Sequence, residues 1–507
     1  MTLTAGEQYL LELINRARLD PAAEAERYGV SLNAGLTAGT IGTGALQVLA
    51  PSAALEAAAT AHSTWMLEED RFSHAGQGGS DAGARIQAHG YDFLGSWGWR
   101  ENLAWVGSTG TVDTVAAIEQ HHAGLYRSAS HRVNTFAPEM QEIGIGQVAG
   151  RFTQGGTTYN SSMLTENFAR SGDTVFITGV AYRDADRDDF YSVGEGQTGV
   201  WIAADGTRAT TAAAGGYAVG IDTQDAARVS VGIGGTRLAV LDMDTGDGNV
   251  KLDIVTQTDG SRVLEVSAST MLVSGITDAT LLGSADLDLR GSNLGNTLTG
   301  NDGDNRIDGK GGNDVIHGGA GADRVDGGYN NDVVYGGDGN DLVLGYSGFD
   351  RVYGGNGNDT VMGGVGGDQV HGDAGNDLLL GQGGRDRLFG GAGNDRLLGG
   401  DGPDRLFGGA GDDLIDGGSG HDMMTGDAGR DRFVFSGFQD RITDFTDNVD
   451  TLYIRADVAG GARTVAQVLQ MGEIVNGDAV FNFGGGHVLT LDDVGSLQLL
   501  ANDMIII

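Results

Sequence analysis

The sequence contains no cysteine, which excludes several kinds of chemistry. Disulfide scaffolds, thiolate zinc sites and thiol catalysis all need that residue. Basic residues are scarce as well, with 31 lysines and arginines against 69 acidic residues and a formal net charge of −38. Because an acidic chain repels phosphate backbones and anionic lipid, we expect no nucleic-acid partner and favour cations as ligands.

Long apolar runs and familiar enzyme motifs are also missing. No stretch of about eighteen apolar residues is present, and the first residues lack the basic and apolar regions of a secretory signal. We therefore expect no membrane span and no Sec signal. The chain has no His-Glu-x-x-His motif, and its nearest approach to Gly-x-Ser-x-Gly, at 78–82, ends in alanine. These absences argue against a zincin protease and a lipase.

Glycine is abundant, with 90 residues against 4 prolines, and part of it belongs to a strict nine-residue repeat. An apolar residue stands two positions after each repeat aspartate, and glycine stands two positions before it except at Asn330. Asn305 and Asn296 extend the same register backwards. The repeat aspartates are Asp314, Asp323, Asp332, Asp341, Asp350, Asp359, Asp368, Asp377, Asp386, Asp395, Asp404, Asp413, Asp422 and Asp431.

The composition of the repeat predicts a calcium site in every turn. Glycine permits turns that aim carbonyl oxygens inward, and the aspartate adds a charged oxygen. Transition metals prefer nitrogen or sulfur ligands, which the repeat does not offer, and magnesium needs a tighter octahedron. We expect six residues of turn and three of strand per repeat, with the apolar residue in a shared core. A disordered glycine-rich linker is the alternative, but a linker keeps no such register.

The block from about 291 to 435 resembles the RTX, or hemolysin-type, parallel β-roll. That resemblance implies calcium binding and export by a type I secretion apparatus that reads an uncleaved C-terminal signal. The segments 440–445 and 503–507 resemble tails of that family. Weaker individual sites are expected where the repeat departs from its pattern, at Asn305, Asn330, Tyr346 and Gln382.

The region before the block predicts mixed helix and strand. Thr4 and Glu7 are spaced as a capping box for a first helix, a second helix is expected after Pro51-Ser52, and a third spans about 112–126. Short alternating runs between glycine turns predict a small β domain from about 173 to 290. Further strands, including 488–491, are expected beyond the repeats.

Several short motifs in the first region together resemble the CAP superfamily, in its bacterial SCP-like branch, over about 7–170. They are found at 13–18, 72–76, 100–104, 130–134, 142–146 and 164–169. The resemblance implies an α-β-α sandwich with a cleft lined by His74, Glu101 and His131. It also implies a further acid, for which Glu119 is available on the preceding helix, with His122 one turn later on the same face.

Three roles stay open for this cleft. Two imidazoles with one or two carboxylates suit a divalent metal such as zinc, acid-base chemistry, or a purely structural hydrogen-bond network. Among the other histidines, His62 is expected to pack within its helix, whereas His89 and His121 are expected at the surface.

A second acidic cluster occupies a twelve-residue segment from Asp184. Asp184, Asp186, Asp188 and Glu195 stand at positions 1, 3, 5 and 12, the ligand spacing of an EF-hand loop. Asp189 replaces the expected glycine at position six, and a strand rather than a helix precedes the loop. The segment resembles the calcium-bearing loop of bacterial-surface, immunoglobulin-like B-repeat domains, which implies a spacer module. A solvated acidic turn is the alternative.

These observations predict a multidomain fold. The expected order is a CAP-like α-β-α sandwich at 1–172, a small β-sandwich spacer at 173–290, a parallel β-roll at 291–435 and a β-rich tail at 436–507 that carries the secretion signal.

We expect a secreted, extracellular calcium-binding protein, free or associated with a cell surface. Its roll folds on calcium after export, and its cleft binds an extracellular lipid or protein. A secreted hydrolase acting through the cleft and a structural matrix protein are the alternatives. Because the cleft offers no recognisable activated nucleophile, binding is favoured and no catalytic residue is assigned.

Overall fold

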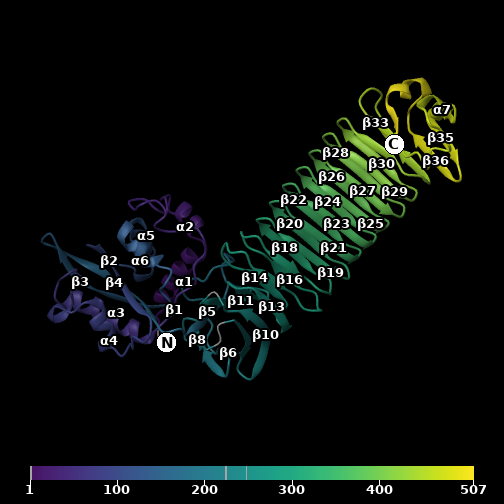
Figure 1. Cartoon of the computed structure of the whole chain (residues 1–507). Helices are drawn as coiled ribbons and strands as arrows, with labels where there is room; N and C mark the ends of the chain where they lie inside the picture. The colour runs from purple at the N-terminus through teal and green to yellow at the C-terminus, as the bar shows by residue number, and fades with distance from the viewer. Residues whose placement is uncertain (1–2, 223–224, 247) are drawn as a thin grey trace. The chain divides into compact units, whose positions relative to one another are not determined.

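The computed structural model describes residues 3–222, 225–246 and 248–507. The chain divides into two compact units, Met1–Ala285 and Asp286–Ile507, whose elements are labelled in Figure 1. No helix within the described ranges is long and apolar enough to cross a membrane.

The N-terminal part of the first unit is built on one four-stranded sheet, in the order β1-β3-β4-β2. The strands are β1 (Ala50–Pro51), β2 (Trp97–Ser108), β3 (Glu142–Gln154) and β4 (Thr157–Ser171). The helices are α1 (Ala5–Leu19), α2 (Pro21–Arg27), α3 (Ala53–Glu68), α4 (Ala82–Ala88), α5 (Thr114–Arg127) and α6 (Ala129–Thr135), with a short 3-10 turn η1 (Gln77–Gly79).

Residues along β3 point alternately to the two faces of this sheet, and this alternation explains why helices cover both faces. Ile143 and Ile145 are buried in one apolar cluster with residues of α1 and α5. Gly144 and Gly146 point the other way, where a side chain would overlap the backbone of α3. Glycine therefore lets α3 lie directly on the sheet. The predicted α-β-α sandwich is confirmed, as is the capping box, in which the Thr4 side chain accepts from Glu7 N at 3.2 Å.

The remainder of the first unit consists of two small sheets. Their orders are β8-β5-β11-β12-β14 and β7-β6-β9-β10-β13. The strands are β5 (Val175–Arg183), β6 (Val200–Ala204), β7 (Thr207–Thr210), β8 (Gly216–Ile221), β9 (Ala226–Ile233), β10 (Thr236–Asp244), β11 (Val250–Thr256), β12 (Arg262–Val266), β13 (Thr270–Gly275) and β14 (Asp278–Leu281).

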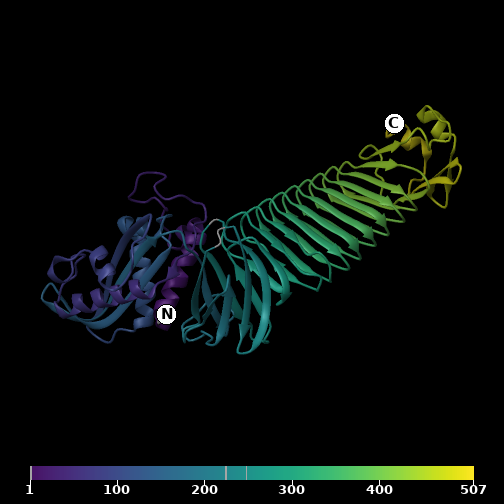
Figure 2. The ribbon, with the colours of Figure 1, turned by 60° about the horizontal axis from the view of Figure 1, so that its bottom comes forward.

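The second unit is a parallel β-roll, visible in Figure 2 as a regular stack of strands. Successive strands alternate between two sheets, and each pairs in parallel with the strand 18 residues further on, as Val325 does with Val343. One sheet contains β16 (Thr297–Thr299), β18 (Val315–Ala320), β20 (Val333–Asp338), β22 (Arg351–Asn356), β24 (Gln369–Ala374), β26 (Arg387–Ala392), β28 (Arg405–Ala410), β30 (Met423–Ala428) and β32 (Gln439–Ile442).

The opposite sheet carries the odd-numbered strands. These are β15 (Asp288–Arg290), β17 (Arg306–Asp308), β19 (Arg324–Tyr329), β21 (Leu342–Gly348), β23 (Thr360–Gly366), β25 (Leu378–Gly384), β27 (Arg396–Asp401), β29 (Leu414–Ser419), β31 (Arg432–Phe435) and β33 (Thr451–Ile454). The apolar residue of every repeat is fully buried between the sheets, so the predicted shared core is confirmed.

The prediction of three-residue strands was wrong for most of the roll. β19, for example, has 6 residues. Its ladder pairs Arg324 to Asp326, skips Gly327 and resumes at Gly328. The glycine pair thus continues the parallel pairing after one break, so most of the expected turn is hydrogen-bonded strand.

The C-terminal residues extend both sheets of the roll. β36 (His487–Leu491) pairs in parallel with β32, and β37 (Met504–Ile506) pairs in parallel with β33. The remaining elements are α7 (Val465–Leu469), β34 (Gly472–Val475), β35 (Asp478–Gly484) and a 3-10 turn η2 (Leu497–Asn502). The predicted strand at 488–491 is confirmed.

Candidate calcium sites and the histidine cleft

The repeat aspartates form two columns, one along each sheet of the roll. Each is at most 3% exposed. The backbone N–H of each aspartate from Asp314 to Asp422 donates to Oδ1 of the aspartate 18 residues further on, as Asp359 does to Asp377 at 2.8 Å. The columns therefore hold carboxylates at fixed spacing in the interior of the roll.

The second carboxylate oxygen of these residues lacks a partner. Oδ2 is buried and without a hydrogen bond in every repeat aspartate from Asp314 to Asp422. Burying a carboxylate oxygen without a hydrogen-bond donor costs free energy. A bound cation usually compensates for that cost. These oxygens are the strongest sign of cation sites in the second unit.

The surroundings of each unpartnered oxygen are lined with further oxygens. A side chain at Gly318 would place its Cβ only 2.6 Å from Asp323 Oδ2, and it would also overlap the carbonyl oxygen of Gly336. The space exists because the position is glycine. An all-oxygen cradle with a carboxylate fits calcium and offers nothing to a soft metal.

Burial raises the pKa of these carboxyl groups. The pKa of Asp377 rises to about 7, first because of burial and then because Asp395 and Asp359 lie nearby, although the N–H of Asp359 opposes the shift. The pKa of Asp323 and of Asp404 rises in the same way to about 7. Without a cation, the interior of the roll thus favours protonated aspartates.

Two further aspartates continue the columns beyond the predicted block. Asp422 N donates to Asp440 Oδ1 at 3.1 Å, and Asp431 N donates to Asp450 Oδ1 at 2.9 Å. Asp440 stands nine residues after Asp431, and Ile442, two positions later, is fully buried. The nine-residue register by itself predicts Asp440. Asp450 stands one residue later than the same register predicts.

The residues that depart from the repeat pattern adopt the backbone conformation that the turn requires. Tyr346 and Gln382 both have φ of 74°, and Asn330 has φ of 80°, at positions where other turns carry glycine. Asn305 supplies a neutral amide whose Oδ1 accepts from Asn301 N at 2.8 Å. It therefore provides no charged oxygen, and weaker binding at these turns remains a prediction.

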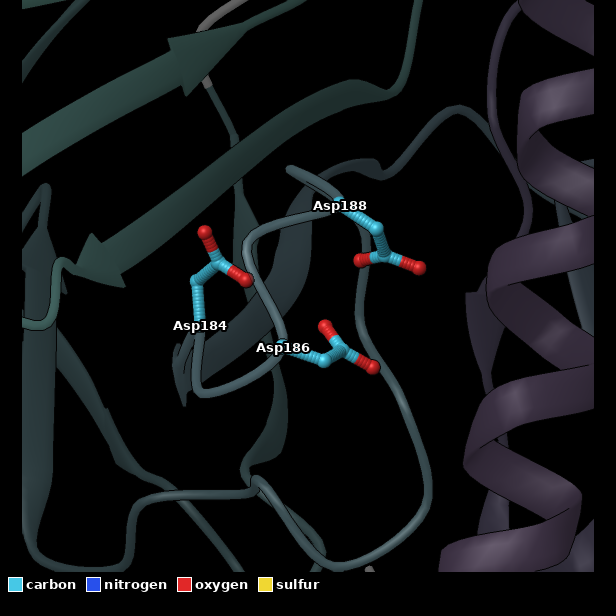
Figure 3. Close-up of side chains that lie close together, drawn as sticks. All are labelled: Asp184, Asp186 and Asp188. Atoms are coloured by element: carbon cyan, nitrogen blue, oxygen red, sulfur yellow. The ribbon is translucent and has the colours of Figure 1, made fainter.

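The acidic loop after β5 brings three of its predicted ligands together. Figure 3 shows the carboxylates of Asp184, Asp186 and Asp188 pointing toward one another. Their ligand oxygens lie within 4.8 Å of each other, and no other group of three histidines or acids in the described residues meets this criterion. Asp184 is fully buried; its Oδ1 accepts from Arg187 N at 2.8 Å, and its Oδ2 has no partner.

Glu195 lies outside this trio and closes the loop instead. Its two carboxylate oxygens accept from Ala185 N at 2.7 Å and from Ser192 N at 2.9 Å. Asp189, in the place of the expected glycine, adopts a positive φ of 54°. The loop thus keeps the sharp turn of an EF-hand without its glycine.

In the cleft, Glu101 on β2 contacts His74. The distance from His74 Nδ1 to Glu101 Oε1 is 2.8 Å, and Arg85 on α4 donates to the other oxygen, Oε2. Arg85 also donates to the carbonyl oxygens of His74 and Ser80. Both carboxylate oxygens of the buried Glu101 therefore have partners, and one of these partners is Arg85, a cation outside the sequence motifs.

His131, on α6, lies near this pair. Burial lowers its pKa, and the positive charge of His74 lowers it further. The carbonyl oxygen of His131 accepts from Asn102, which also donates to Glu166 at 3.0 Å. Burial raises the pKa of Glu166 to about 7, so a second carboxyl group, also missed from the sequence, supports this side of the cleft.

The other two predicted cleft residues have different partners. Glu119 is exposed and accepts from Tyr9 on α1 at 3.1 Å. His122 is buried, with its Nε2 at 3.1 Å from Glu24 on α2. The structure therefore does not bring Glu119 or His122 to His74 and Glu101. Within the described residues, the ligand atoms of His74, Glu101 and His131 do not lie close enough to one another to hold a metal ion as they stand.

Two predictions about the remaining histidines are confirmed and one was wrong. His62 is packed in α3 with Nε2 at 2.9 Å from Ser73 O, and His89 is exposed. His121, expected at the surface, is buried, and its Nε2 lies 2.9 Å from Ser162 Oγ. Burial lowers the pKa of His121 to about 4. Its helix packs against β4, which the local sequence does not reveal.

Comparison with known families matches two separate segments of the chain. Residues 290–433 match the model of the RTX calcium-binding nonapeptide repeat. Residues 11–159 match the CAP model, described as the cysteine-rich secretory protein family. The chain carries a CAP domain followed by RTX repeats. Its CAP domain lacks the cysteines of that description.

Two solved structures are similar over part of the chain. One is an extracellular protein containing an SCP domain from Bacillus anthracis str. Ames, with 21% identity, a TM-score of 0.19, and coverage of 34% of this chain and 45% of that one. The other is the extracellular lipase LipA from Serratia marcescens, with 19% identity, a TM-score of 0.21, and coverage of 46% and 40%. The chain spans less than half the length of either protein.

No curated protein matches the chain. The RTX repeats and the CAP domain support a calcium-binding, secreted protein.

Proposed function

We propose that this protein is exported by a type I secretion apparatus, that its roll folds on calcium outside the cell, and that its CAP domain then binds an extracellular ligand. The observation that carries the proposal is the pair of aspartate columns with buried, unpartnered Oδ2 atoms. A roll that leaves so many carboxylates unpaired has a strong need for cations.

A simple comparison of energies supports folding on calcium. Each repeat buries only one apolar side chain, and the free energy gained by that burial is small beside the backbone entropy lost when nine residues are ordered. Calcium that binds only the folded roll shifts the equilibrium toward it. At the low calcium concentration of a cytosol, the chain stays extended and competent for export.

The calcium midpoint of folding tests which oxygens bind the ion. We expect Asp359→Asn and Asp377→Asn to raise this midpoint by about tenfold each, since each removes one charged ligand from a mid-block turn. Asn305→Ala, at the edge of the block, is expected to change it little. The measurement is circular dichroism of the full chain during a calcium titration.

Asp373→Asn is the matched control. Asp373 is an exposed acid near the end of β24, four residues before Asp377, so its substitution removes the same charge while leaving every column carboxylate in place. Because the charge of Asp373 contributes to the raised pKa of Asp377, a small rise of the midpoint is expected for this variant. An equal rise of the midpoint for Asp373→Asn and Asp377→Asn would show that general charge, and not the buried oxygens, sets calcium affinity.

The loop at Asp184 is proposed as a further calcium site. Its support is the buried, unpartnered Oδ2 of Asp184, which lies beside the carboxylates of Asp186 and Asp188. Repulsion within the trio contributes to a raised pKa for Asp188, after burial. A cation would relieve that repulsion and hold the chain between β5 and β6.

For the cleft we propose ligand binding rather than catalysis. Glu101 is held by His74 and Arg85, which leaves it no free oxygen to act as a base. The ligand is an extracellular lipid or protein. A hydrolase using this cleft remains the competing hypothesis, and turnover lost on His74→Ala would favour it.

Zinc in the cleft has to compete with Arg85 for Glu101. We expect the calcium-saturated chain to take up zinc weakly at neutral pH and Arg85→Gln to bind it more tightly, because that change frees Glu101 Oε2. Adding His74→Ala with His131→Ala is expected to abolish the uptake in either background. Calorimetric titration with zinc measures both effects.

His89→Ala is the control, since His89 is exposed and its ring contacts the carbonyl oxygen of Arg85 in its own helix and no other hydrogen-bond partner among the described residues. Unchanged zinc stoichiometry in the His74 and His131 double variant would exclude the cleft as the zinc site.

A further inference from the structure

The outer face of the sheet that contains β18 to β30 carries a group of arginines. In each turn the residue two positions after the aspartate is buried, so the residues one and three positions after it face outward. Arg387 on β26 and Arg405 on β28 are direct neighbours in register. With Arg385, just before β26, they line a cavity of about 250 Å³.

These three guanidinium groups are unpaired. All three residues are exposed, and none has an ion-pair or hydrogen-bond partner for its side chain among the described residues. The carboxylates nearest in sequence, Asp368 and Asp386, are buried in the aspartate column. Asp368 and Asp386 line the same cavity, but both are buried and neither forms an ion pair with these arginines. In a chain with 69 acidic residues, three exposed arginines without an ion-pair partner among the described residues mark a place where an anion is favoured.

Beside the arginines runs a ladder of stacked rings. It lies three positions after the column aspartates of this sheet, so Phe389 and Phe407 share a face with Arg387 and Arg405. Ring centroids in the ladder are 4.6 to 5.1 Å apart, and the rings are within 17° of parallel. Its members are His317, Tyr335, Tyr353, His371, Phe389 and Phe407.

The arginine row continues beyond the cavity. Arg351 on β22 occupies the same register position, two strands from Arg387, with Gln369 between them. Its side chain also has no partner among the described residues. A row of cations along several strands suits a polymer better than a single small ion.

We propose that this face of the roll binds an anionic polysaccharide. Guanidinium groups form paired hydrogen bonds to planar oxyanions, and Arg385, Arg387 and Arg405 supply three of them around one cavity. The ring ladder next to them gives an apolar strip for the C–H groups of sugar rings. The overall negative charge of the chain disfavours a nucleic acid at the same place.

Carboxylate and sulfate groups share the required chemistry, and the probes separate them. The full, calcium-saturated chain is titrated with hyaluronan oligosaccharides, which carry carboxylates, with dextran sulfate, and with neutral dextran. We expect binding of at least one anionic polymer that weakens as salt is added, and no binding of neutral dextran. Equal binding of neutral dextran, or no binding of either anionic polymer, would overturn the proposal.

A matched pair of variants tests the location. Arg387→Gln with Arg405→Gln is expected to weaken binding by about tenfold or more, since it removes two charge-assisted contacts. Arg396→Gln with Arg432→Gln removes the same charge from the same repeat position on the opposite sheet. Arg396 neighbours Leu378 and Leu414 there, so this variant is expected to bind within about twofold of the wild type.

Equal weakening in both double variants would show that general charge, not this face, attracts the polymer. The calcium midpoint of each variant reports whether its roll is intact. Arg385→Gln, outside the strands, is the second test: it is expected to weaken binding while leaving that midpoint unchanged. Unaltered binding in both Arg385→Gln and the Arg387 and Arg405 variant would contradict the proposal.

Discussion

A fragment spanning Asp286–Ile507 is expected to be largely unfolded in chelator and to gain β-structure cooperatively as calcium is added. This fragment is one of the two compact units of the chain. Its core has one buried apolar residue per repeat, while each turn from Asp314 to Asp422 buries a carboxylate whose Oδ2 has no hydrogen-bond partner among the described residues. Calcium supplies that partner, so binding and folding are one event. Far-ultraviolet circular dichroism during a calcium titration measures the change.

Magnesium is the control for the fragment. It demands a small, regular octahedron and gives up water reluctantly, so it is expected to leave the fragment unfolded at the same concentration. A fragment that is already fully β-structured in chelator would show that the columns do not need a cation.

Acid is expected to replace part of the effect of calcium. The pKa of Asp377 is about 7 in the folded roll and 3.8 in its ordinary state, so ionisation opposes folding. That penalty is absent below 3.8 and increases as the pH rises toward about 7. In chelator the fragment should therefore show more β-structure at pH 5 than at pH 8. With calcium present, acid should raise the calcium midpoint, because protons compete for the same oxygens.

Gly384→Ala is expected to destabilise the calcium-loaded roll by more than about 3 kcal/mol, because it combines a steric overlap with an unfavourable backbone conformation. Gly384 has φ of 147°, and a Cβ there would overlap the carbonyl oxygen of Gly366 in the preceding turn of the same sheet. The carbonyl cannot move without shifting its own turn. Thermal unfolding in saturating calcium measures the loss.

The adjacent residue provides the matched control. A Cβ at Gly383 would meet nothing within 4 Å, so Gly383→Ala is expected to change the stability by less than about 1 kcal/mol. Similar losses of stability for the two variants would mean that the stacked turns move to accommodate a side chain. Glycine two residues before the aspartate would then not be a steric requirement.

The sequence by itself determined the roll. Turns that stack at a separation of 18 residues repeat one environment, so a single register identifies both the buried residues, such as Val325 and Val343, and the carboxylates. The capping box at Thr4 and Glu7 was predictable for a related reason, since its partners are three residues apart. In both cases the contacts are local or periodic, and a linear pattern contains them.

Only the tertiary structure decided the cleft and the acidic loop. His122 lies against Glu24, 98 residues away in sequence, and Arg85 contacts Glu101 across two elements. Glu195 stands at a ligand position of the EF-hand spacing, but its carboxylate accepts a hydrogen bond from the loop backbone. A side chain with several possible partners is directed by whichever one the packing of helices and sheet brings within reach. That choice depends on the whole fold, whereas the repeat specifies its own neighbours.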